Sequence, residues 1–345
     1  MENANQPTLA NIMNLGTGFW ASKILLAALK LGLFTKLAQN KKMSAKDIRN
    51  ALSLKCTDRH VYDFLDALTA FKLLNREGLM ETAIYSNTPD TDTFLDKNKP
   101  SYCGGMLEML NNRLYTFWGN LEEGLLTGEA QNEAKRGEDF FGLIYQDQDK
   151  LREFINAMTG IQMGNFIALA QKVDFSKYKT LVDIGGSAGL LSIMVAKHQP
   201  HMTCTTVDLP PVEPIARDTI KQYQLSDRVK TRNIDFFTDD FPKADVITMG
   251  NILHDWDEEK KLMLMKKAYA ALTPGGAFIA VEAIIDDERK QNAFGLMMSL
   301  NMLIETATGF DYTFADFTRW AKSIGFKSTS ILQLTGPSSA ALAFK

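Results

Sequence analysis

The chain has 345 residues, of which 45% are hydrophobic and 23% charged. These proportions are typical of soluble globular domains and exclude disordered, collagen-like and coiled-coil proteins. At about 150 residues per domain, the length predicts roughly two domains. Thirty-eight Lys and Arg against forty-one Asp and Glu give a net charge of −3, which argues against nucleic acid or an anionic membrane as a partner.

Cysteine spacing and apolar runs limit the remaining classes. Cys56, Cys103 and Cys204 are scattered without a CxxC pair, so neither a disulfide framework nor a structural zinc site is predicted. No signal-peptide pattern is visible at the start. The longest apolar runs, such as Ala277–Ile285, are far shorter than the roughly 20 residues that span a bilayer. We therefore expect a cytoplasmic protein with no membrane segment.

Residues 1–95 show the element order of a winged-helix domain. Apolar residues at helical spacing predict a helix over Thr17–Ala38. Ser44 is a suitable N-cap for the next helix and Asp58 for the third. Two strands are then expected to turn at Gly78.

The helix in the recognition position of this domain has several acids and few basic side chains. DNA binding requires clustered Lys and Arg for phosphate contacts. A dimerisation module is therefore the favoured interpretation.

Residues 96–172 are predicted to form a helical connector. Helical patterns cover Tyr102–Thr127 and Asp147–Val173, and a polar segment around Gly128–Glu138 separates them.

From residue 173 to residue 345, strands alternate with helices. This alternation predicts an α/β fold with a doubly wound, mainly parallel sheet. The expected strands are Thr180–Ile184, Thr203–Val207, Val229–Asn233, Asp245–Met249 and Ala277–Ala283.

A glycine-rich loop follows the first of these strands and reads Asp183-Ile-Gly185-Gly186-Ser-Ala-Gly189. A dinucleotide-binding loop has the spacing G-x-G-x-x-G, which places a pyrophosphate at a helix N-terminus. Here the spacing differs, and the carboxylate of Asp183 would repel a pyrophosphate. S-adenosylmethionine (SAM) has no phosphate and carries two positive groups, so it suits this loop better.

Two further acids stand where later strands of the sheet end. Asp208 follows Gly189 by nineteen residues and is placed to accept from both ribose hydroxyls, because an ionised carboxylate is an acceptor only. Asp235 can accept from the adenine amino group. The alternative is that these acids cap loops at the carboxyl edge of the sheet, which is also the edge where such folds bind ligands.

Four motifs in this order resemble the SAM-dependent O-methyltransferase family, which includes plant caffeic acid methyltransferases and bacterial polyketide and phenazine methyltransferases. The resemblance extends over nearly the whole chain. The motifs are Val182-Asp-Ile-Gly-Gly-Ser-Ala-Gly189, Val207-Asp-Leu-Pro-Pro211, Ile252-Leu-His-Asp-Trp256 and Leu272-Thr-Pro-Gly-Gly276.

This resemblance implies a class I methyltransferase domain with SAM as cofactor and a homodimer formed through the N-terminal domain. It places Gly185 beside the methionine part of SAM, Asp208 at the ribose, and Asp235 with Phe236 at the adenine. The plant enzymes have a Lys-Trp pair where this chain has Gly250 and Asn251.

His254 is the candidate general base, since it follows the fourth expected strand at the ligand-binding edge. An imidazole whose pKa is near 6.5 suits proton removal from an alcohol or a phenol. By resemblance, Glu282 and Asp311 are its partner carboxylates. The alternative is a structural histidine that caps a helix together with Asp255. No metal-ligand spacing is found, so no metal is expected.

The acceptor is expected to bind beside a late helix over Phe294–Thr306. Asn301 is its polar candidate, with Glu305 one turn further on, and flexible apolar side chains would complete the site. The alternative interpretation of the apolar residues is a core stripe. The proposed pocket residues are Met158, Met163, Trp118, Met298, Asn301 and Met302.

The sequence thus predicts SAM-dependent methyl transfer to a small molecule, with a hydroxyl acceptor deprotonated by His254. Three alternatives remain open at this point. One is an S-methyltransferase acting on a methylthio-hydroxy acid, which would need no base. The others are a SAM-binding DNA regulator and an NAD-dependent oxidoreductase.

Overall fold

The computed structural model describes residues 8–99, 101–136 and 144–345. The chain divides into two compact units, Met1–Asn112 and Arg113–Lys345. The helical stretch between residues 96 and 172 is shared between them, because α7 (Gly104–Met109) belongs to the first unit and α11 (Gln148–Lys172) to the second. Part of the expected polar segment, residues 137 and 138, lies outside the described residues.

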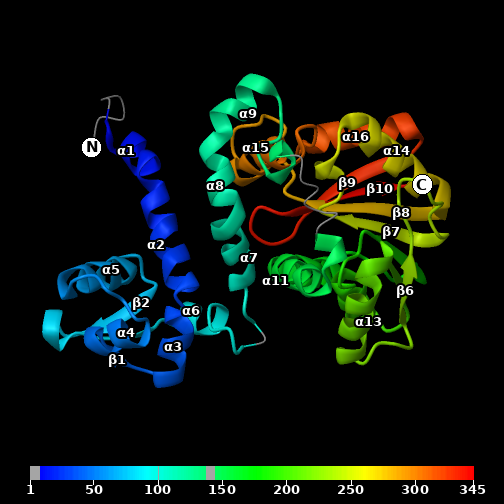
Figure 1. The fold of residues 1–345 in the computed structure, drawn as a ribbon. Coiled ribbons are helices and arrows are strands. Elements are labelled where there is room, and N and C mark those ends of the chain that lie inside the picture. Colours follow the sequence, from blue (N-terminus) through cyan, green and yellow to red (C-terminus); the bar gives the residue numbers. More distant parts are fainter. Residues whose placement is uncertain (1–7, 100, 137–143) are drawn as a thin grey trace, which may run out of the picture. The chain divides into compact units, whose positions relative to one another are not determined.

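The first unit packs helices around a small antiparallel sheet whose strand order is β1-β3-β2 (Figure 1). Leu29, Phe34, Leu65 and Tyr85 form the centre of its core and are at most 2% exposed. The elements are α1 (Ala10–Gly16), α2 (Gly18–Lys30), α3 (Leu33–Asn40), β1 (Met43–Ser44), α4 (Ala45–Ala51), α5 (Asp58–Ala70), β2 (Leu74–Glu77), β3 (Ile84–Asn87), α6 (Pro89–Phe94) and α7.

Ser44 caps α4 as predicted, since its hydroxyl accepts from the amide of Asp47. Three other boundaries in this unit were predicted wrongly. The expected single helix is divided at Gly32, whose φ of 75° breaks the helical path. Thr57, not Asp58, caps α5. The second expected strand starts only at Ile84, because a 3₁₀ turn occupies the residues before it.

The expectation about apolar length also needs correction. The segment Ala10–Lys30 has 21 residues and contains an 18-residue window with a mean hydropathy of 1.3, so it is long and apolar enough to cross a membrane by length and composition. Small and polar residues interrupt its apolar runs, so it shows no long uninterrupted apolar run. Only 17% of that window is buried. Its exposed apolar side chains include Ile12, Leu15, Phe19 and Trp20.

The second unit is built on a seven-stranded sheet in the order β6-β5-β4-β7-β8-β10-β9 (Figure 1). The first five strands in this order are parallel, and β10 is antiparallel to both of its neighbours. The strands are β4 (Thr180–Ile184), β5 (Thr203–Asp208), β6 (Val229–Asn233), β7 (Ala244–Gly250), β8 (Leu272–Glu282), β9 (Ser328–Gln333) and β10 (Ser339–Phe344).

The sheet separates two apolar cores because successive strand residues point to opposite faces. On β4, Leu181 belongs to the core beneath α11, α12 (Leu190–His198) and α13 (Glu213–Gln222). Its neighbour Val182 belongs to the core beneath α14 (Glu258–Ala271) and α16 (Phe314–Ile324). The result is a three-layer α/β unit, which confirms the expected fold class.

The predicted helix over residues 102–127 is divided into several short elements. From Leu110 onward these are a π-helix (Leu110–Leu114), α8 (Tyr115–Phe117), a 3₁₀ turn (Trp118–Asn120) and α9 (Leu121–Thr127), followed by a 3₁₀ turn (Glu133–Arg136).

Two further elements complete the second unit. The strand β8 begins at Leu272 instead of after the Pro-Gly-Gly turn, and the helix α15 (Ala293–Thr306) follows it.

Candidate active site

The glycine loop after β4 passes so close to its neighbours that side chains would not fit. A Cβ at Gly186 would lie 2.1 Å from Oγ1 of Thr206 and 2.8 Å from Oδ2 of Asp183. A Cβ at Gly185 would lie 2.4 Å from Cδ1 of Ile252, and Gly185 has a φ of +65°. Gly189, with a φ of 76°, is the N-cap of α12. These glycines are therefore required by the path of the loop.

Asp183 lies beneath this loop and is only 2% exposed. Its Oδ1 accepts from the hydroxyl of Thr248 on β7 at 2.7 Å. Burial raises the pKa of Asp183 to about 7, because desolvation disfavours the carboxylate. In this structure Asp183 joins the loop to the neighbouring strand.

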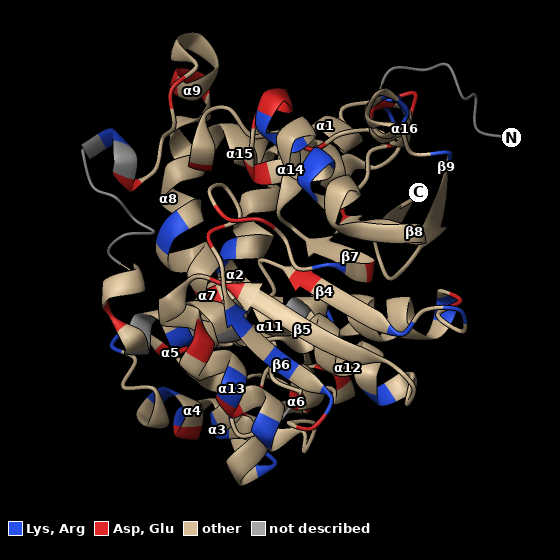
Figure 2. Cartoon of the chain, turned by 90° about the vertical axis from the view of Figure 1, so that its right-hand side faces the viewer, with Lys and Arg blue, Asp and Glu red and all other residues tan. Residues whose placement is uncertain are grey.

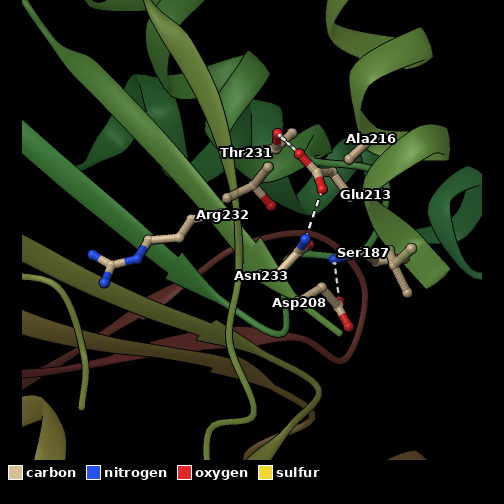
Figure 3. A pocket seen from close by; sticks show the side chains of 9 residues that line it. Ser187, Asp208, Glu213, Ala216, Thr231, Arg232 and Asn233 are labelled. Atoms are coloured by element: carbon tan, nitrogen blue, oxygen red, sulfur yellow. Dashed lines mark hydrogen bonds between the residues drawn. The ribbon is translucent and has the colours of Figure 1, made fainter. Parts of the chain in front are cut away.

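Asp208 at the end of β5 is held by two backbone amides. Its Oδ2 accepts from the amide of Ser187 at 2.9 Å (Figure 3). Its Oδ1 accepts from the amide of Leu209 at 2.8 Å. Burial raises the pKa of this carboxyl group. A small cavity beside Asp208 is lined by Ser187, Thr206, Val212, Glu213, Ala216, Thr231, Arg232 and Asn233.

The segment after β6 brings aromatic rings to the same edge of the sheet. Cε1 of Phe236 lies 3.8 Å from the position that a Cβ on Gly185 would occupy. The centres of the Phe236 and Phe237 rings are 4.7 Å apart, and the rings meet edge-on. The Phe237 ring in turn meets Trp256 at 4.6 Å. Asp235 accepts from the amide of Phe237 at 2.9 Å. Phe236 thus forms one wall beside the glycine loop.

These residues fit SAM. The hydroxyl oxygen of Thr206 is buried beside Gly186 and has no hydrogen-bond partner within the described residues. Asp208 supplies the acceptor oxygens that ribose hydroxyls need. The loop closes around Gly185 and Gly186 without a basic side chain of its own, which suits a ligand that carries no phosphate.

His254 is buried among three carboxylates at the neighbouring strand ends. It lies in a 3₁₀ turn, Leu253–Asp255, and its amide donates to Oε1 of Glu282 at 3.2 Å. Its ring Nδ1 is 3.4 Å from Oδ1 of Asp311, and Nε2 is 3.4 Å from Oδ1 of Asp255. His254 is 7% exposed, Glu282 1% and Asp311 2%, whereas the side chain of Asp255 is 35% exposed.

The carboxylates control the protonation of this ring. Burial alone would lower the pKa of His254, but Asp255, Asp311 and Glu282 outweigh burial and raise the pKa to about 10. Burial also raises the pKa of Asp255, to about 6, and that of Glu282. Several polar atoms of the cluster have no hydrogen bond within the described part of the chain: Nδ1 of His254, Oε2 of Glu282 and both carboxylate oxygens of Asp311.

Some of the expected acceptor-pocket residues are brought together. The indole N–H of Trp118 donates to Oδ1 of Asn301 at 2.9 Å, and Nδ2 of Asn301 is 4.0 Å from the sulfur of Met298. One turn further along α15, Glu305 accepts from Arg113 at 3.1 Å. Trp118, Met298 and Asn301 therefore lie together and combine an aromatic ring, a sulfur and an amide. The Arg113–Glu305 pair adds a contact between the π-helix Leu110–Leu114 and α15.

The other expected pocket residues are distributed differently. Met302 is 5% exposed and therefore buried on α15. Met158 and Met163 lie on α11, where Met163 packs against the core on one face of the sheet. For Met163, the contact with the core agrees with the alternative interpretation of a core stripe.

Basic and acidic residues both occur on several helices and strands in the view of Figure 2. On α5 of the first unit, Arg59 is paired with Asp63, and Asp66 is paired with Arg76. Among the described residues, no group of three His, Cys, Asp or Glu side chains is placed to hold a metal ion.

Comparison with known proteins identifies the family. The family model described as "O-methyltransferase domain" matches residues 118–327, and the one described as "O-methyltransferase dimerisation domain" matches residues 13–97. The chain belongs to the SAM-dependent O-methyltransferase family. It is 36% identical to the tetracenomycin polyketide synthesis 8-O-methyl transferase TcmO of Streptomyces glaucescens, over 97% of this chain and 96% of that protein.

Two further relatives support the same assignment. The 3-hydroxy-5-methyl-1-naphthoate 3-O-methyltransferase of Streptomyces sahachiroi is 30% identical over 96% of this chain and 92% of its own length. The crystal structure of human N-acetylserotonin methyltransferase in complex with SAM has a TM-score of 0.88 at 25% identity and covers 99% of each chain. The protein is therefore a SAM-dependent methyltransferase, and neither match favours the S-methyltransferase alternative.

The structure adds residues that the sequence analysis did not single out. Thr206 and Thr248 contact the glycine loop and Asp183, and Ile252 fills the space that a side chain on Gly185 would need. Thr206 and Thr248 lie on strands next to β4, so their position near strand ends was the available signal. Lys261 and Tyr312 are also buried. Lys261 gave no signal because it follows the charged segment Asp257-Glu-Glu-Lys260, which indicates a solvated helix start.

Proposed function

We propose that this enzyme methylates a phenolic hydroxyl group of a small aromatic acceptor, with His254 as the general base. The observation that carries this proposal is the buried position of His254 between Asp311 and Asp255, at the sheet edge that also bears the glycine loop. SAM, when bound, supplies the methyl group on a sulfonium that is already a good leaving group. The protein must then align the acceptor and remove its proton.

The basicity of His254 supports a phenol as acceptor. Its pKa of about 10 is close to that of a phenol, about 10, and proton transfer is efficient when the two values match. Because only the neutral ring accepts a proton, turnover should increase as the pH rises through the alkaline range. Asp311 faces Nδ1 and orients the ring, while Glu282 holds the backbone amide of the same residue.

The cofactor would be held by the loop and by the acids around it. We assign Asp208 to the ribose hydroxyls and Asp235 with Phe236 to the adenine. Gly185, Gly186 and Gly189 allow the close approach of the backbone, and Asp183 supports the loop from below. The support for these assignments is the exclusion of side chains at Gly185 and Gly186 and the unpartnered hydroxyl of Thr206.

The acceptor would lie against α15. Trp118, Met298 and Asn301 offer an aromatic face, a polarisable sulfur and an amide, which suit a flat aromatic molecule with polar substituents. Met302, Met158 and Met163 complete the proposed set. The names of two relatives, a polyketide 8-O-methyl transferase and a naphthoate 3-O-methyltransferase, agree with an aromatic acceptor.

Replacement of His254 tests this function. We expect His254→Ala to retain SAM binding in calorimetric titration and to lose about 10²–10⁴-fold in turnover of a hydroxynaphthoate, because general-base catalysis contributes this much. His60→Ala, at an exposed position of the first unit, is the matched control. Undiminished turnover by His254→Ala would reject the base and favour a sulfur or nitrogen acceptor.

We further propose a cytoplasmic homodimer formed through the first unit. The support is the match to a dimerisation domain over residues 13–97, together with the exposed apolar side chains of Ile12, Leu15, Phe19 and Trp20 on α1 and α2. Exposed apolar patches of this kind commonly mark contact surfaces. Light scattering on the purified chain should give twice the monomer mass of 38.6 kDa.

A further inference from the structure

An arginine in the π-helix Leu110–Leu114 holds two carboxylates that are largely buried. Nε and Nη2 of Arg113 each donate to the carboxylate of Glu133 at 2.7 Å. Nη2 also donates to Oε2 of Glu305 at 3.1 Å. All three side chains are at most 19% exposed. Because a guanidinium fork pairs with carboxylates in a defined geometry, Arg113 fixes where these two groups lie.

The two carboxylates belong to the helix α15 and to the segment that caps it. α15 ends one residue after Glu305, and the last carbonyl groups of a helix have no partner within it. The amide of Gln131 donates to the carbonyl oxygen of Ile304 at 2.8 Å. The side-chain amide of Asn132 donates to the carbonyl oxygen of Glu305, also at 2.8 Å. Glu133 follows this cap directly, so Arg113 joins the cap to the helix.

The end of α15 depends on contacts from outside the helix. Ala307, directly after the helix, has a φ of 65°, which is unfavourable for a residue that has a Cβ. Backbone in this region persists only where the surrounding structure holds it. The cap formed by Gln131 and Asn132 provides contacts of this kind, and Arg113 secures that cap through side chains.

The stretch that carries Arg113 also contacts α15 one turn further back. Trp118 follows Arg113 by five residues, and its indole N–H donates to Oδ1 of Asn301 at 2.9 Å. Asn301 precedes Glu305 by four residues, so their side chains are neighbours on the helix. The guanidinium group lies 5.5 Å from the centre of the Phe117 ring, directly before Trp118. This stretch is therefore attached to α15 at two points that are one turn apart.

Stability alone does not explain why three charged groups are buried together here. Desolvation offsets much of their attraction, and well-packed apolar side chains often give equal or greater stability. An arginine fork provides a fixed direction and distance, which an apolar side chain does not. The π-helix that carries Arg113 is a rare element that occurs frequently at functional sites. The arrangement is therefore suited to holding α15 in one position.

We propose that Arg113 is a positioning residue for the methyl acceptor. By joining Glu133 to Glu305, it fixes the end of α15. The pair formed by Trp118 and Asn301, against which the acceptor binds, is thereby held in place. This inference rests on the proposed function, in which the acceptor lies against α15. Without the guanidinium group, two carboxylates face each other in a largely buried site and repel, so the cap separates from the helix.

The first test compares the KM of the acceptor with the affinity for SAM in Arg113→Gln. We expect the KM of a hydroxynaphthoate to rise about tenfold, because hydrogen bonds between charged groups are lost. The Kd of SAM should stay unchanged, since the proposed cofactor residues follow β4, β5 and β6. Arg113→Lys keeps the charge without the fork and should raise the KM less.

The matched control is Arg319→Gln, which removes an exposed arginine from its ion pair with Asp316 on α16. Exposed ion pairs contribute little, so this variant should keep the KM of the unmodified protein.

A second measurement follows the Trp118–Asn301 pair without acceptor or turnover. The chain has four tryptophans, so the indole N–H signal of Trp118 can be assigned in isotope-labelled protein by its loss in Trp118→Phe. In Arg113→Gln we expect this signal to move and its proton to exchange faster with solvent, because Asn301 is no longer held against the indole. The signal should stay in place in Arg319→Gln.

The proposal requires both changes. An unchanged KM, or an unchanged Trp118 signal, in folded Arg113→Gln overturns it. A purely structural role would lower the midpoint of thermal unfolding and the fraction of protein that binds SAM, and it would leave the KM and the Trp118 signal as they are. If Arg113→Gln does not fold, Glu133→Gln takes its place. That variant leaves Arg113 beside Glu305, so a rise in KM of about threefold is expected, and an unchanged KM overturns the proposal.

This proposal and the proposed function fail in different ways. Normal turnover by His254→Ala would overturn the base, whereas the Trp118 signal in Arg113→Gln tests the positioning role whatever the base is. A weaker affinity for SAM in Arg113→Gln, with the KM of the acceptor unchanged, would overturn the positioning of the acceptor and leave the base intact.

Discussion

The proposed cofactor side and the proposed base side of the candidate active site lie at the same edge of one sheet, but they are built differently. On the cofactor side, Asp208 accepts from two backbone amides and Asp183 accepts from a threonine hydroxyl. On the base side, Asp311 and Glu282 are buried with oxygen atoms that have no hydrogen bond within the described structure. The first region is fixed by hydrogen bonds and close packing, whereas the second depends on a balance of charges.

This difference separates the consequences of mutation. Where backbone amides hold a carboxylate, a change of shape is the most damaging change, because the ligand-binding geometry is lost. Where buried charges oppose one another, a change of charge with little change of shape is enough to alter the chemistry. The following three predictions test this separation, and they begin with the largest expected effect.

Gly186→Ala should damage the cofactor side by shape alone. Its Cβ would lie 2.1 Å from Oγ1 of Thr206, so the loop must move. We expect SAM affinity to fall about a hundredfold, equivalent to about 3 kcal/mol of overpacking, in calorimetric titration. Gly250→Ala is the control at the same sheet edge, because its Cβ would make an ordinary contact 3.5 Å from Phe166. Equal SAM binding by both variants would contradict the packing argument.

Asp311→Asn should alter the base side by charge alone. Removal of this carboxylate takes away one of the groups that raise the pKa of His254, so the pKa of the ring should fall. The acid limb of the kcat profile should therefore move to lower pH, by about one unit. The maximal rate should also fall because the ring loses its orienting partner.

The control for Asp311→Asn is Asp240→Asn, which removes a carboxylate at an exposed position and should leave the profile unchanged. A limb that moves upward in Asp311→Asn, or remains in place, would show that Asp311 does not act on His254 through its charge.

Trp118→Phe should have the smallest effect, since it removes one hydrogen bond at the proposed acceptor surface. The indole N–H donates to Asn301 at 2.9 Å, and a neutral hydrogen bond contributes about 0.5–1.5 kcal/mol. We expect KM for the aromatic acceptor to rise about two- to tenfold, with SAM affinity unchanged. An unchanged KM for the acceptor would remove Trp118 from the proposed pocket.

The sequence predicted the parallel part of the sheet closely because its signals are local. Thr180–Ile184 and Val229–Asn233 have the predicted bounds, and the predicted glycine loop leads directly into α12. Alternating strands and helices, each ended by Gly or an acid, are readable within a few residues. The last two strands, β9 and β10, were not predicted. The antiparallel pairing of β10 with β8 joins residues about sixty positions apart, and β9 joins the sheet only through β10.

The candidate site could be predicted only to the level of motifs. Glycines, Asp208 and His254 stand in a recognisable order, and the structure places them at neighbouring strand ends. The burial of Lys261 could not be predicted, because the residue follows an ordinary charged segment, Asp257-Glu-Glu-Lys260, that indicates a solvated helix start. Its burial results from the Phe310 segment, which folds over it from fifty residues further along the chain.

The position of β10 has a consequence for how the sheet is completed. β10 lies between β8 and β9, although it follows both in the chain. Until residues 339–344 are synthesised, β8 keeps one edge without a partner, and an open apolar edge strand is a site of unwanted pairing with other chains. The strand that ends at Glu282, and with it the support for His254, is therefore enclosed on both sides only once β10 has paired with it.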